Sequence, residues 1–291
     1  VLQTKPGAIA CPAMDKLVQM TGLTKVKEKA LALYSAAVAK MRLSPEKRLD
    51  SSHNFVMLGN PGTGKTTVAR LLGQMLHELG VRSSEEFIET SGEKLARMGV
   101  DKACDKIEEA KGGVLFIDEA YSLKPSKNAD GGAIAMEILD KADNWRTELT
   151  IIVVGYKQDM ERELFDFNPG FSSRFNTTFM FEDYDNDELA SIFGEIVRTR
   201  EDGEPRGWLT DSDDVAHVAA RRLGRGRNTK GFGNARSARN LFEAAANRAM
   251  MRTDFDPESP TLKIVDIVGV RPDRDNNPAL RAAMNELDEM I

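Results

Sequence analysis

The sequence predicts an α/β protein, in which helices flank a parallel five-stranded sheet and a smaller helical domain follows. Short, fully apolar runs alternate with helical patterns over about the first 184 residues, as in a parallel sheet buried on both faces. From residue 187 to 251 only helical patterns occur. The chain has 291 residues, which is enough for two packed units.

The amino-terminal part combines a linker with a long helical pattern. Residues 1–13 contain two prolines and show no clear period, so we expect a linker there. From Asp15 to Arg42 apolar residues recur at helical spacing among lysines and glutamates, which predicts helical structure. The polar stretch from Ser44 to His53 ends this pattern.

Five apolar runs are the predicted strands of the sheet. A Gly-rich turn and a predicted helix from Lys65 to Leu79 follow the first of them. The runs are Phe55–Leu58, Phe87–Thr90, Val114–Ile117, Ile151–Val154 and Thr177–Phe181. Because they alternate with helical patterns and carry few charges, we place them in one parallel sheet.

The smaller domain is predicted from three helical patterns, after which the chain becomes rich in Pro and Asp. These patterns are Leu189–Val197, Val215–Leu223 and Ser237–Met250. We therefore expect a large α/β domain over residues 14–184 and a helical domain over 185–255. A short apolar piece from Leu262 to Val270 follows.

The two ends of the chain resemble each other. Residues 13–21 and 283–291 share four of nine positions. Either two amphipathic helix starts look alike by chance, or the chain is one unit of a tandem array. The second interpretation makes residues 256–291 a linker and the start of a next module, and the first residue, Val1, fits a fragment or a processed form.

The bulk composition excludes several classes of protein. Hydrophobic residues make up 41% and charged residues 30%, as in ordinary soluble domains. The formal net charge of −6 argues against a nucleic-acid partner. No apolar run reaches the ~20 residues that span a bilayer, so no membrane partner is expected. Two cysteines fit free thiols in a reducing compartment, and we expect an intracellular, soluble protein, in the cytoplasm.

A phosphate-binding motif follows the first predicted strand and opens a helix. Gly59-Asn60-Pro61-Gly62-Thr63-Gly64-Lys65-Thr66 matches the pattern G-x-x-x-x-G-K-[ST] in the context that it requires. Backbone N–H groups of such a loop and the positive end of the following helix bind phosphates. Lys65 then reaches the β- and γ-phosphates, and the Thr66 hydroxyl binds Mg²⁺. We include Thr67, the next residue, among the ATP-binding candidates.

A buried strand that ends in two carboxylates supplies the second part of the site. Asp118 and Glu119 directly follow the run Val114–Ile117. In this position Asp118 is a candidate to hold Mg²⁺ through water, and Glu119 is a candidate general base for the attacking water. Because Glu119 supplies a base, the pair favours ATP hydrolysis over simple ATP binding.

Several motifs together resemble the CbbX/CfxQ family of AAA+ ATPases. That family includes red-type Rubisco activases and sporulation protein K-like ATPases. The resemblance covers residues 14–251. The motifs that carry it are Gly59–Thr66, Gly112–Tyr121, Val154–Lys157, Asn168–Arg174 and Asn234–Asn240. It implies a P-loop AAA+ fold, with the helical domain as a lid over the nucleotide.

The resemblance also implies roles for residues outside the two motifs. Arg174 would be an arginine finger that reaches the γ-phosphate bound to a neighbouring subunit, where a guanidinium neutralises developing charge. Arg236 resembles the sensor-2 arginine of the lid, and Arg239 lies on the same helix face three residues later. Tyr156 stands where many AAA+ proteins have a polar sensor-1 residue.

One stretch departs from the family. Its members usually carry an aromatic residue in a short pore loop after the second strand, whereas Leu95–Val100 has none. An aromatic side chain grips a threaded chain by its large apolar contact. Met98 is a softer alternative, and the other interpretation is that this module threads nothing.

Three functions remain open at this level. The first is an ATPase that remodels a protein client within a ring of homologous or identical subunits, six as the family implies. The second is a regulatory ATP-binding module of a tandem AAA+ protein. The third, a nucleic-acid-acting ATPase, is disfavoured by the acidic charge, although a basic cluster could bind nucleic acid or a phosphorylated effector. That cluster, which better fits subunit contact or nucleotide sensing, is Arg221, Arg222, Arg225, Arg227 and Lys230.

Overall fold

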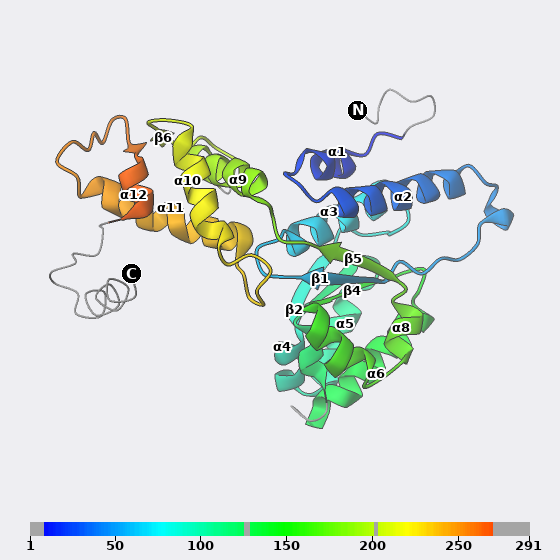
Figure 1. The fold of residues 1–291 in the computed structure, drawn as a ribbon. Coiled ribbons are helices and arrows are strands. Elements are labelled where there is room, and N and C mark those ends of the chain that lie inside the picture. Colours follow the sequence, from blue (N-terminus) through cyan, green and yellow to red (C-terminus); the bar gives the residue numbers. More distant parts are fainter. Residues whose placement is uncertain (1–8, 125–128, 201–202, 270–291) are drawn as a thin grey trace, which may run out of the picture. The chain divides into compact units, whose positions relative to one another are not determined.

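The computed structural model describes residues 9–124, 129–200 and 203–269. The chain divides into two compact units (Figure 1). Unit 1 comprises the residues up to Tyr184 together with the segment Asn228–Asn234, and unit 2 comprises Asp185–Arg227 and the residues from Ala235 onward. The segment 228–234 thus belongs to the first unit, although it lies between two helices of the second.

Unit 1 contains the predicted parallel sheet. All four pairs of neighbouring strands are parallel, and the strand order is β2-β3-β4-β1-β5. The five strands are β1 (Phe55–Gly59), β2 (Phe87–Ser91), β3 (Val114–Asp118), β4 (Thr150–Gly155) and β5 (Thr177–Phe181). The predicted fold class and all five predicted strands are therefore confirmed.

Helices cover both faces of this sheet (Figure 1). On one face lie α1 (Pro12–Gln19), α2 (Thr24–Met41) and α3 (Lys65–Glu78), with the 3₁₀ turn η2 (Pro45–Lys47) after α2. The other face carries α4 (Gly92–Met98), α5 (Val100–Glu109), α6 (Ala129–Asn144) and α8 (Gly170–Arg174). Three short segments complete this unit, namely η3 (Ala120–Leu123), α7 (Lys157–Asp159) and the π-helical turn η4 (Met160–Phe165).

Side chains from alternate strand positions build a core on each face. Val56, Leu115 and Val153 join the cluster under α4, α5 and α6. Their neighbours along the strands point to the opposite face, where Phe55 and Phe179 meet edge to face at 5.6 Å. Burial of both faces is why the strand sequences are almost wholly apolar.

The helical pattern predicted from Asp15 to Arg42 is two helices in the structure. Gly22 and Leu23 both have positive φ, at 64° and 60°, and this left-handed turn separates α1 from α2. Apolar spacing continues across the turn, which is why the sequence pattern did not show the break. The last two residues of the predicted linker, Pro12 and Ala13, belong to α1 in the structure.

Unit 2 is helical, with one short pair of strands. Its elements are α9 (Asn186–Arg198), β6 (Leu209–Thr210), α10 (Asp214–Gly224), most of α11 (Asn234–Met250), β7 (Thr261–Leu262) and α12 (Ile264–Val268). A capping box in which Asp185 and Glu188 exchange bonds starts α9. The unit continues past residue 255, where the predicted lid ended, because Ile267 of α12 is buried and Arg222 of α10 donates to its carbonyl.

Three further expectations concern features outside the sheet. Both cysteines are free, and burial raises the pKa of the Cys11 thiol to about 12. No helix in the described ranges is long and apolar enough to cross a membrane. The sequence echo at residues 283–291 lies outside the described residues.

Candidate active site

The phosphate-binding motif and the paired carboxylates lie at the same edge of the sheet. In a parallel sheet all carboxyl ends point to one edge, and ligands of open α/β sheets bind there. β1 ends at Gly59, β3 at Asp118 and β4 at Gly155. We call this the carboxyl edge. Since β4 separates β3 from β1, Asp118 stands two strand spacings, or about 10 Å, from the β1 axis.

The backbone of the phosphate loop has the conformation of an anion nest. Gly62 and Gly64 have φ of 69° and 91°, which turns successive N–H groups toward one side. A Cβ at Gly59 would meet the Phe181 carbonyl oxygen at 2.3 Å, so only glycine fits beside β5. α3 then begins at Lys65, and no side chain caps its first turn. Its first N–H groups are therefore available for a phosphate.

Lys65 and Thr63 are held by carbonyl oxygens of the loop. The Lys65 ammonium donates to the Gly59 oxygen at 2.9 Å and to the Asn60 oxygen at 2.6 Å. The Thr63 hydroxyl, which is fully buried, donates to the same Asn60 oxygen at 2.9 Å. Thr66 and Thr67 follow Lys65 in the first turn of α3. The positive charge of Lys65 thus lies directly against the loop.

The carboxylate pair sits in a strained turn after β3. The Asp118 side chain accepts the backbone N–H of Glu119 at 2.9 Å. Glu119 has φ 48° and ψ 43°, a left-handed conformation that costs a non-glycine residue about 1 kcal/mol. This turn leaves Glu119 exposed while Asp118 is half-buried. Nearby, burial raises the pKa of Tyr121, and the negative charges of Glu119 and Asp159 add to the effect.

These residues fit a magnesium–nucleotide complex better than a bare metal ion. No group of three or more His, Cys, Asp or Glu side chains that could cage a metal occurs within the described part of the chain. Mg²⁺ at ATPase sites usually takes one or two protein oxygens and completes its shell with phosphates and water. Asp118 and the Thr66 hydroxyl are such oxygens, and the glycine nest and the uncapped start of α3 suit the phosphates.

A partly buried polar network, which no sequence motif indicated, holds the phosphate loop from the side. Its centre is Asp183, which follows β5. The Asp183 carboxylate accepts from the Asn60 side-chain amide at 3.0 Å, from the Asn234 amide at 2.8 Å and from the Asn228 backbone N–H at 2.9 Å. Three segments far apart in the sequence therefore converge on one carboxylate.

Asn234 is the second member of this network. It is fully buried, with φ 45°, a conformation that asparagine tolerates better than most residues. Its side chain accepts the backbone N–H of Tyr184 at 3.0 Å and donates to the Pro61 carbonyl at 3.3 Å. The Tyr184 hydroxyl in turn donates to the carbonyl of Thr63 at 3.1 Å. The loop is thus tied to the residue that begins α11.

The segment 228–234 makes further contacts with the same edge. Asn60 donates to the Thr229 carbonyl and accepts from the Gly231 N–H, both at 3.1 Å. Lys230 forms an ion pair with Asp159 at 2.7 Å and lies 5.2 Å from the centre of the Tyr156 ring. The predicted sensor Tyr156 is therefore engaged by a cation from this segment. Asparagine at position 60 was the one signal in the motif that could have pointed here.

Arg174 lies at the opposite edge of the sheet. It ends α8, three residues before β5 begins, and β5 runs parallel to β1 with Thr177 beside Phe55 and Phe181 beside Gly59. Its guanidinium forms an ion pair with Asp143, with Nε and Nη2 at 2.7 and 2.5 Å from one carboxylate oxygen. The structure therefore does not bring Arg174 to the phosphate loop of its own chain.

The remaining candidates are dispersed. Arg236 and Arg239 lie exposed on α11, within unit 2. In the basic cluster, Arg222 donates to the carbonyls of Ile267 and Val268, and Arg227 donates to Asn186. These residues belong to unit 2, whereas Lys230 belongs to unit 1.

The stretch compared with a pore loop is mainly helical. Leu95 and Ala96 are buried in the core as part of α4, and Met98 ends that helix and packs partly against the core. Arg97 is the most exposed of the six residues. Its side chain is 75% exposed and forms an ion pair with Glu93. The end of α4 thus stands where a loop was expected, because Leu95 and Ala96 pack into the core as part of this helix.

Comparison with known proteins supports the fold. The model of the ATPase family associated with various cellular activities matches residues 55–182, and an AAA lid domain model matches residues 185–268. A mutant of Thermotoga maritima RuvB aligns with a TM-score of 0.55 and 19% identity, over 87% of this chain and 70% of that one. The FIGL-1 AAA domain, solved in complex with ADP, aligns with a TM-score of 0.60 and 16% identity, over 92% of this chain and 88% of that one.

Relatives in sequence identify the family of the chain more narrowly than the solved structures do. ESX-1 secretion system protein EccA1 of Mycobacterium leprae is 36% identical, over 82% of this chain but 44% of that protein. The chain thus spans less than half the length of this relative. Protein CbbX of Cereibacter sphaeroides is 35% identical, over 80% of this chain and 76% of CbbX. With its phosphate loop, paired carboxylates and lid, the chain belongs to the CbbX/CfxQ-like AAA+ ATPases.

Proposed function

We propose that this chain hydrolyses ATP as one subunit of a ring, with Arg174 of each subunit completing the site of its neighbour. The observation that carries this proposal is the placement of Arg174 and Lys65 at opposite edges of one sheet. The five residues of β5 run from one of these edges to the other and span about 16 Å, which exceeds the reach of an arginine side chain. Arg174 can therefore serve a phosphate only on another subunit.

The carboxyl edge supplies the remaining parts of the proposed reaction. The loop amides and Lys65 bind the β- and γ-phosphates, and Thr66 and Asp118 hold Mg²⁺, which neutralises charge on the phosphate oxygens. Glu119 accepts a proton from the attacking water. Its exposure beside the half-buried Asp118 leaves room for that water. Arg236 and Arg239 remain candidates for nucleotide sensing by the lid, and Tyr156 for sensing from β4.

Asp143 has a defined role in this scheme. Its carboxylate holds Nε and Nη2 of Arg174. The third nitrogen, Nη1, makes one long and weak hydrogen bond, to the Gly170 carbonyl at 3.5 Å. One edge of the guanidinium is thus anchored, and the outer nitrogen remains to meet a neighbouring phosphate. The side chain of Arg174 is 33% exposed, which is compatible with such an approach.

A mixing experiment tests the proposal. Glu119→Gln subunits keep the arginine finger but lack the base, and Arg174→Ala subunits keep the base but lack the finger. Each variant alone should hydrolyse ATP slowly, and equimolar mixing should restore part of the turnover, because mixed neighbours assemble complete sites. The Glu119→Gln/Arg174→Ala double variant mixed with inactive Lys65→Ala is the matched control and should restore nothing. No restoration by the first mixture, with rings formed, would overturn the shared site.

We propose further that hydrolysis drives remodelling of a protein client, as the family resemblance implies for a ring of six. One observation favours a second candidate, a regulatory module: in the stretch Leu95–Val100 the residues Leu95 and Ala96 are buried in the core, and the stretch offers no aromatic grip. The two candidates differ in basal turnover. A motor subunit should hydrolyse ATP at rates that rise with protein concentration, whereas a regulatory module should bind ATP and turn it over negligibly at any concentration.

A further inference from the structure

The segment 228–234 places one lysine at the carboxyl edge of the sheet. Lys230 is the third residue of this segment, which belongs to unit 1. Its ammonium contacts both carboxylate oxygens of Asp159, at 2.9 and 2.7 Å, and lies 5.2 Å from the centre of the Tyr156 ring. Tyr156 directly follows β4, and Asp159 ends the short helix α7 after it. Lys230 therefore stands at the end of β4.

The strand order gives this position a chemical meaning. β4 lies between β3 and β1 in the sheet. The phosphate loop follows β1, and the pair Asp118 and Glu119 stands at the end of β3. In the proposed reaction the loop binds the nucleotide phosphates from one side, and the base activates water from the other. The γ-phosphate then lies between the two, over the end of β4, where Lys230 stands.

Hydrogen bonds tie the backbone on both sides of Lys230 to the phosphate loop. The Asn60 side chain donates to the Thr229 carbonyl and accepts from the Gly231 N–H, both at 3.1 Å. Since Asn60 belongs to the phosphate loop, one side chain sets the distance from this loop to the backbone of Lys230. Gly231 has φ 87°, and the buried Phe232 donates from its N–H to the Thr229 carbonyl at 3.1 Å. The turn therefore holds Lys230 in place before any ligand binds.

The ion pair leaves Lys230 able to bind a ligand. A lysine ammonium carries three N–H donors, and two of them suffice for the two oxygens of Asp159, so one remains outside this pair. The Lys230 side chain is 57% exposed, whereas that of Asp159 is 14% exposed. Because a mostly buried carboxylate is costly without its counter-charge, we expect Lys230 to stay paired when a phosphate binds. Asp159 thus anchors the ammonium, whose other side is open.

Tyr121 lies near both this ion pair and Glu119, the proposed base. A Cβ at Gly155 would meet Tyr121 Cδ1 at 2.9 Å, so the Tyr121 ring lies against the end of β4. Its centre is 6.4 Å from that of the Tyr156 ring. Burial raises the pKa of the Tyr121 hydroxyl, and the negative charges of Glu119 and Asp159 raise it further. Glu119 and Asp159 are thus within electrostatic range of one phenol.

We propose that Lys230 contacts the γ-phosphate of ATP bound to its own chain and makes the site prefer ATP to ADP. Asp159 is then a positioning residue that holds the ammonium, and Asn60 is one that holds the backbone. The inference rests on the proposed binding of the phosphates at the carboxyl edge. Lys230 differs from Lys65, which contacts a phosphate that both nucleotides carry, and from Arg174, which serves a neighbouring subunit.

The ratio of two dissociation constants tests this role. Competition against a fluorescent ADP analogue gives the affinity of the full chain for ADP and for adenylyl imidodiphosphate, a non-hydrolysable ATP analogue, both with magnesium. Lys230→Met should weaken binding of the ATP analogue about tenfold, the effect of one lost charge-assisted bond, and change that of ADP by less than about twofold. Lys230→Arg, which keeps the charge, should retain most of the preference.

Lys111→Met is the matched control. Lys111 also pairs with a carboxylate, that of Glu148 at 3.2 Å, and lies 4.7 Å from the centre of an aromatic ring, that of Trp145. It precedes β3, however, and so lies at the start of a strand and away from the carboxyl edge. Its substitution should leave the ratio of the two affinities unchanged.

Variants of Asp159 separate contact with the phosphate from anchoring of the segment. Asp159→Asn keeps the ammonium and should lower the preference for the ATP analogue by less than about threefold. Lys230→Met/Asp159→Asn lacks the ammonium but also the unpaired carboxylate that would repel a phosphate, and it should still lose most of the preference. If Lys230 only anchors the segment, the ratio of the two affinities stays the same in all of these variants, and the proposal is wrong.

Lys65→Ala distinguishes a failure of this inference from a failure of the nucleotide site itself. It should abolish binding of both nucleotides, with melting curves confirming that each variant is folded. Loss of binding in Lys65→Ala together with an unchanged ratio in Lys230→Met would refute the role of Lys230 alone. Retained binding of both nucleotides in Lys65→Ala would refute the proposed site and this inference with it.

Discussion

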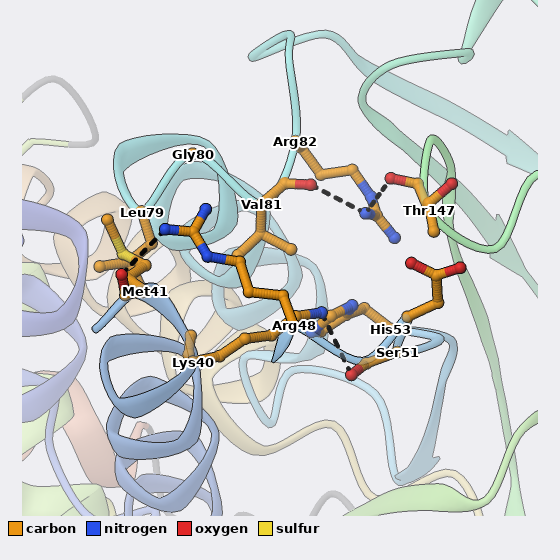
Figure 2. A pocket seen from close by; sticks show the side chains of 12 residues that line it. Lys40, Met41, Arg48, Ser51, His53, Leu79, Gly80, Val81, Arg82 and Thr147 are labelled. Atoms are coloured by element: carbon orange, nitrogen blue, oxygen red, sulfur yellow. Dashed lines mark hydrogen bonds between the residues drawn. The ribbon is translucent and has the colours of Figure 1, made fainter. Parts of the chain in front are cut away.

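The two edges of the sheet handle positive charge in different ways. At the carboxyl edge, backbone geometry and carboxylates dominate: the glycine nest, the Lys65 ammonium on loop carbonyls, and Asp183 at the centre of three bonds. At the amino edge, where β1 and β4 begin, Lys40, Arg48 and Arg82 line a cavity and donate only to neutral acceptors (Figure 2). The first arrangement fits a nucleotide that must be bound, cleaved and released, whereas the second leaves the buried Arg82 without a carboxylate partner.

The contrast shows that positive charge can be gathered by backbone geometry or by side chains. A backbone site requires particular residues at fixed spacing, because glycine must occupy positive φ and a helix must follow. A side-chain site requires only that cations from any segment converge. A third arrangement of positive charge, a cation paired with a carboxylate, also occurs at the amino edge. There Asp143 neutralises the charge of Arg174 within the chain.

The largest effect is expected for Arg174→Ala. If the finger neutralises charge on a neighbouring γ-phosphate, its loss should lower kcat about 10³-fold or more. Steady-state ATPase assays over a range of protein concentrations would measure this effect, and the concentration dependence of specific activity should vanish with it. Arg162→Ala, which removes an exposed arginine paired with Glu163, is the control and should retain normal turnover. Normal turnover in the Arg174 variant would break the link between the two edges.

Glu119→Gln should produce the next largest effect. The amide keeps the size of the side chain but cannot accept the proton of the attacking water, so kcat should fall about 10²- to 10³-fold. Fluorescent-nucleotide titration should show ATP affinity within about threefold of the original. A parallel loss of affinity would mean that Glu119 shapes the loop and is not the base.

Asn234→Ala tests the network that holds the phosphate loop. Removal of the side chain leaves the buried Tyr184 N–H without its acceptor and puts alanine at positive φ. We expect a loss of about 3 kcal/mol in the free energy of unfolding, measured by urea denaturation. Asn144→Ala is the control, because that asparagine is exposed and bonds only within its own helix. Equal stability of the two variants would show that the network contributes little.

The smallest effect concerns acid sensitivity at the amino edge. Burial and the charges of Arg82 and Lys40 lower the pKa of His53 to about 4 from 6.5. Arg48 and Asp50 line the same cavity and face the same group. Between these two values the unfolded chain binds a proton that the folded chain does not, so stability falls as pH falls. The contribution of His53 should be a loss of about 2 kcal/mol from pH 7 to pH 5.

This acid sensitivity can be measured against a neutral variant. His53→Asn should reduce the pH 7 to pH 5 difference in unfolding free energy, obtained from urea curves at each pH. An unchanged pH difference in His53→Asn would assign the acid sensitivity to other groups.

Much of the architecture could be predicted from local patterns. The five apolar runs became five parallel strands because both faces of the sheet are covered, so that most strand positions are apolar. The turn at Gly22 and Leu23 could not be predicted, since apolar spacing on either side of it continues in phase. The stretch Leu95–Val100 was compared with a loop by family analogy, but its apolar residues belong to the core.

The sequence by itself determined the nucleotide-binding loop and the carboxylate pair, because glycines at positive φ, a helix start and a strand end impose fixed spacing along the chain. Only the tertiary structure decided which distant side chains meet. Asp183 with Asn234, Arg174 with Asp143, and the cations around His53 are such sets. Electrostatic and hydrogen-bond partners are chosen by proximity in space, and chain folding sets that proximity without leaving a period or spacing in the sequence.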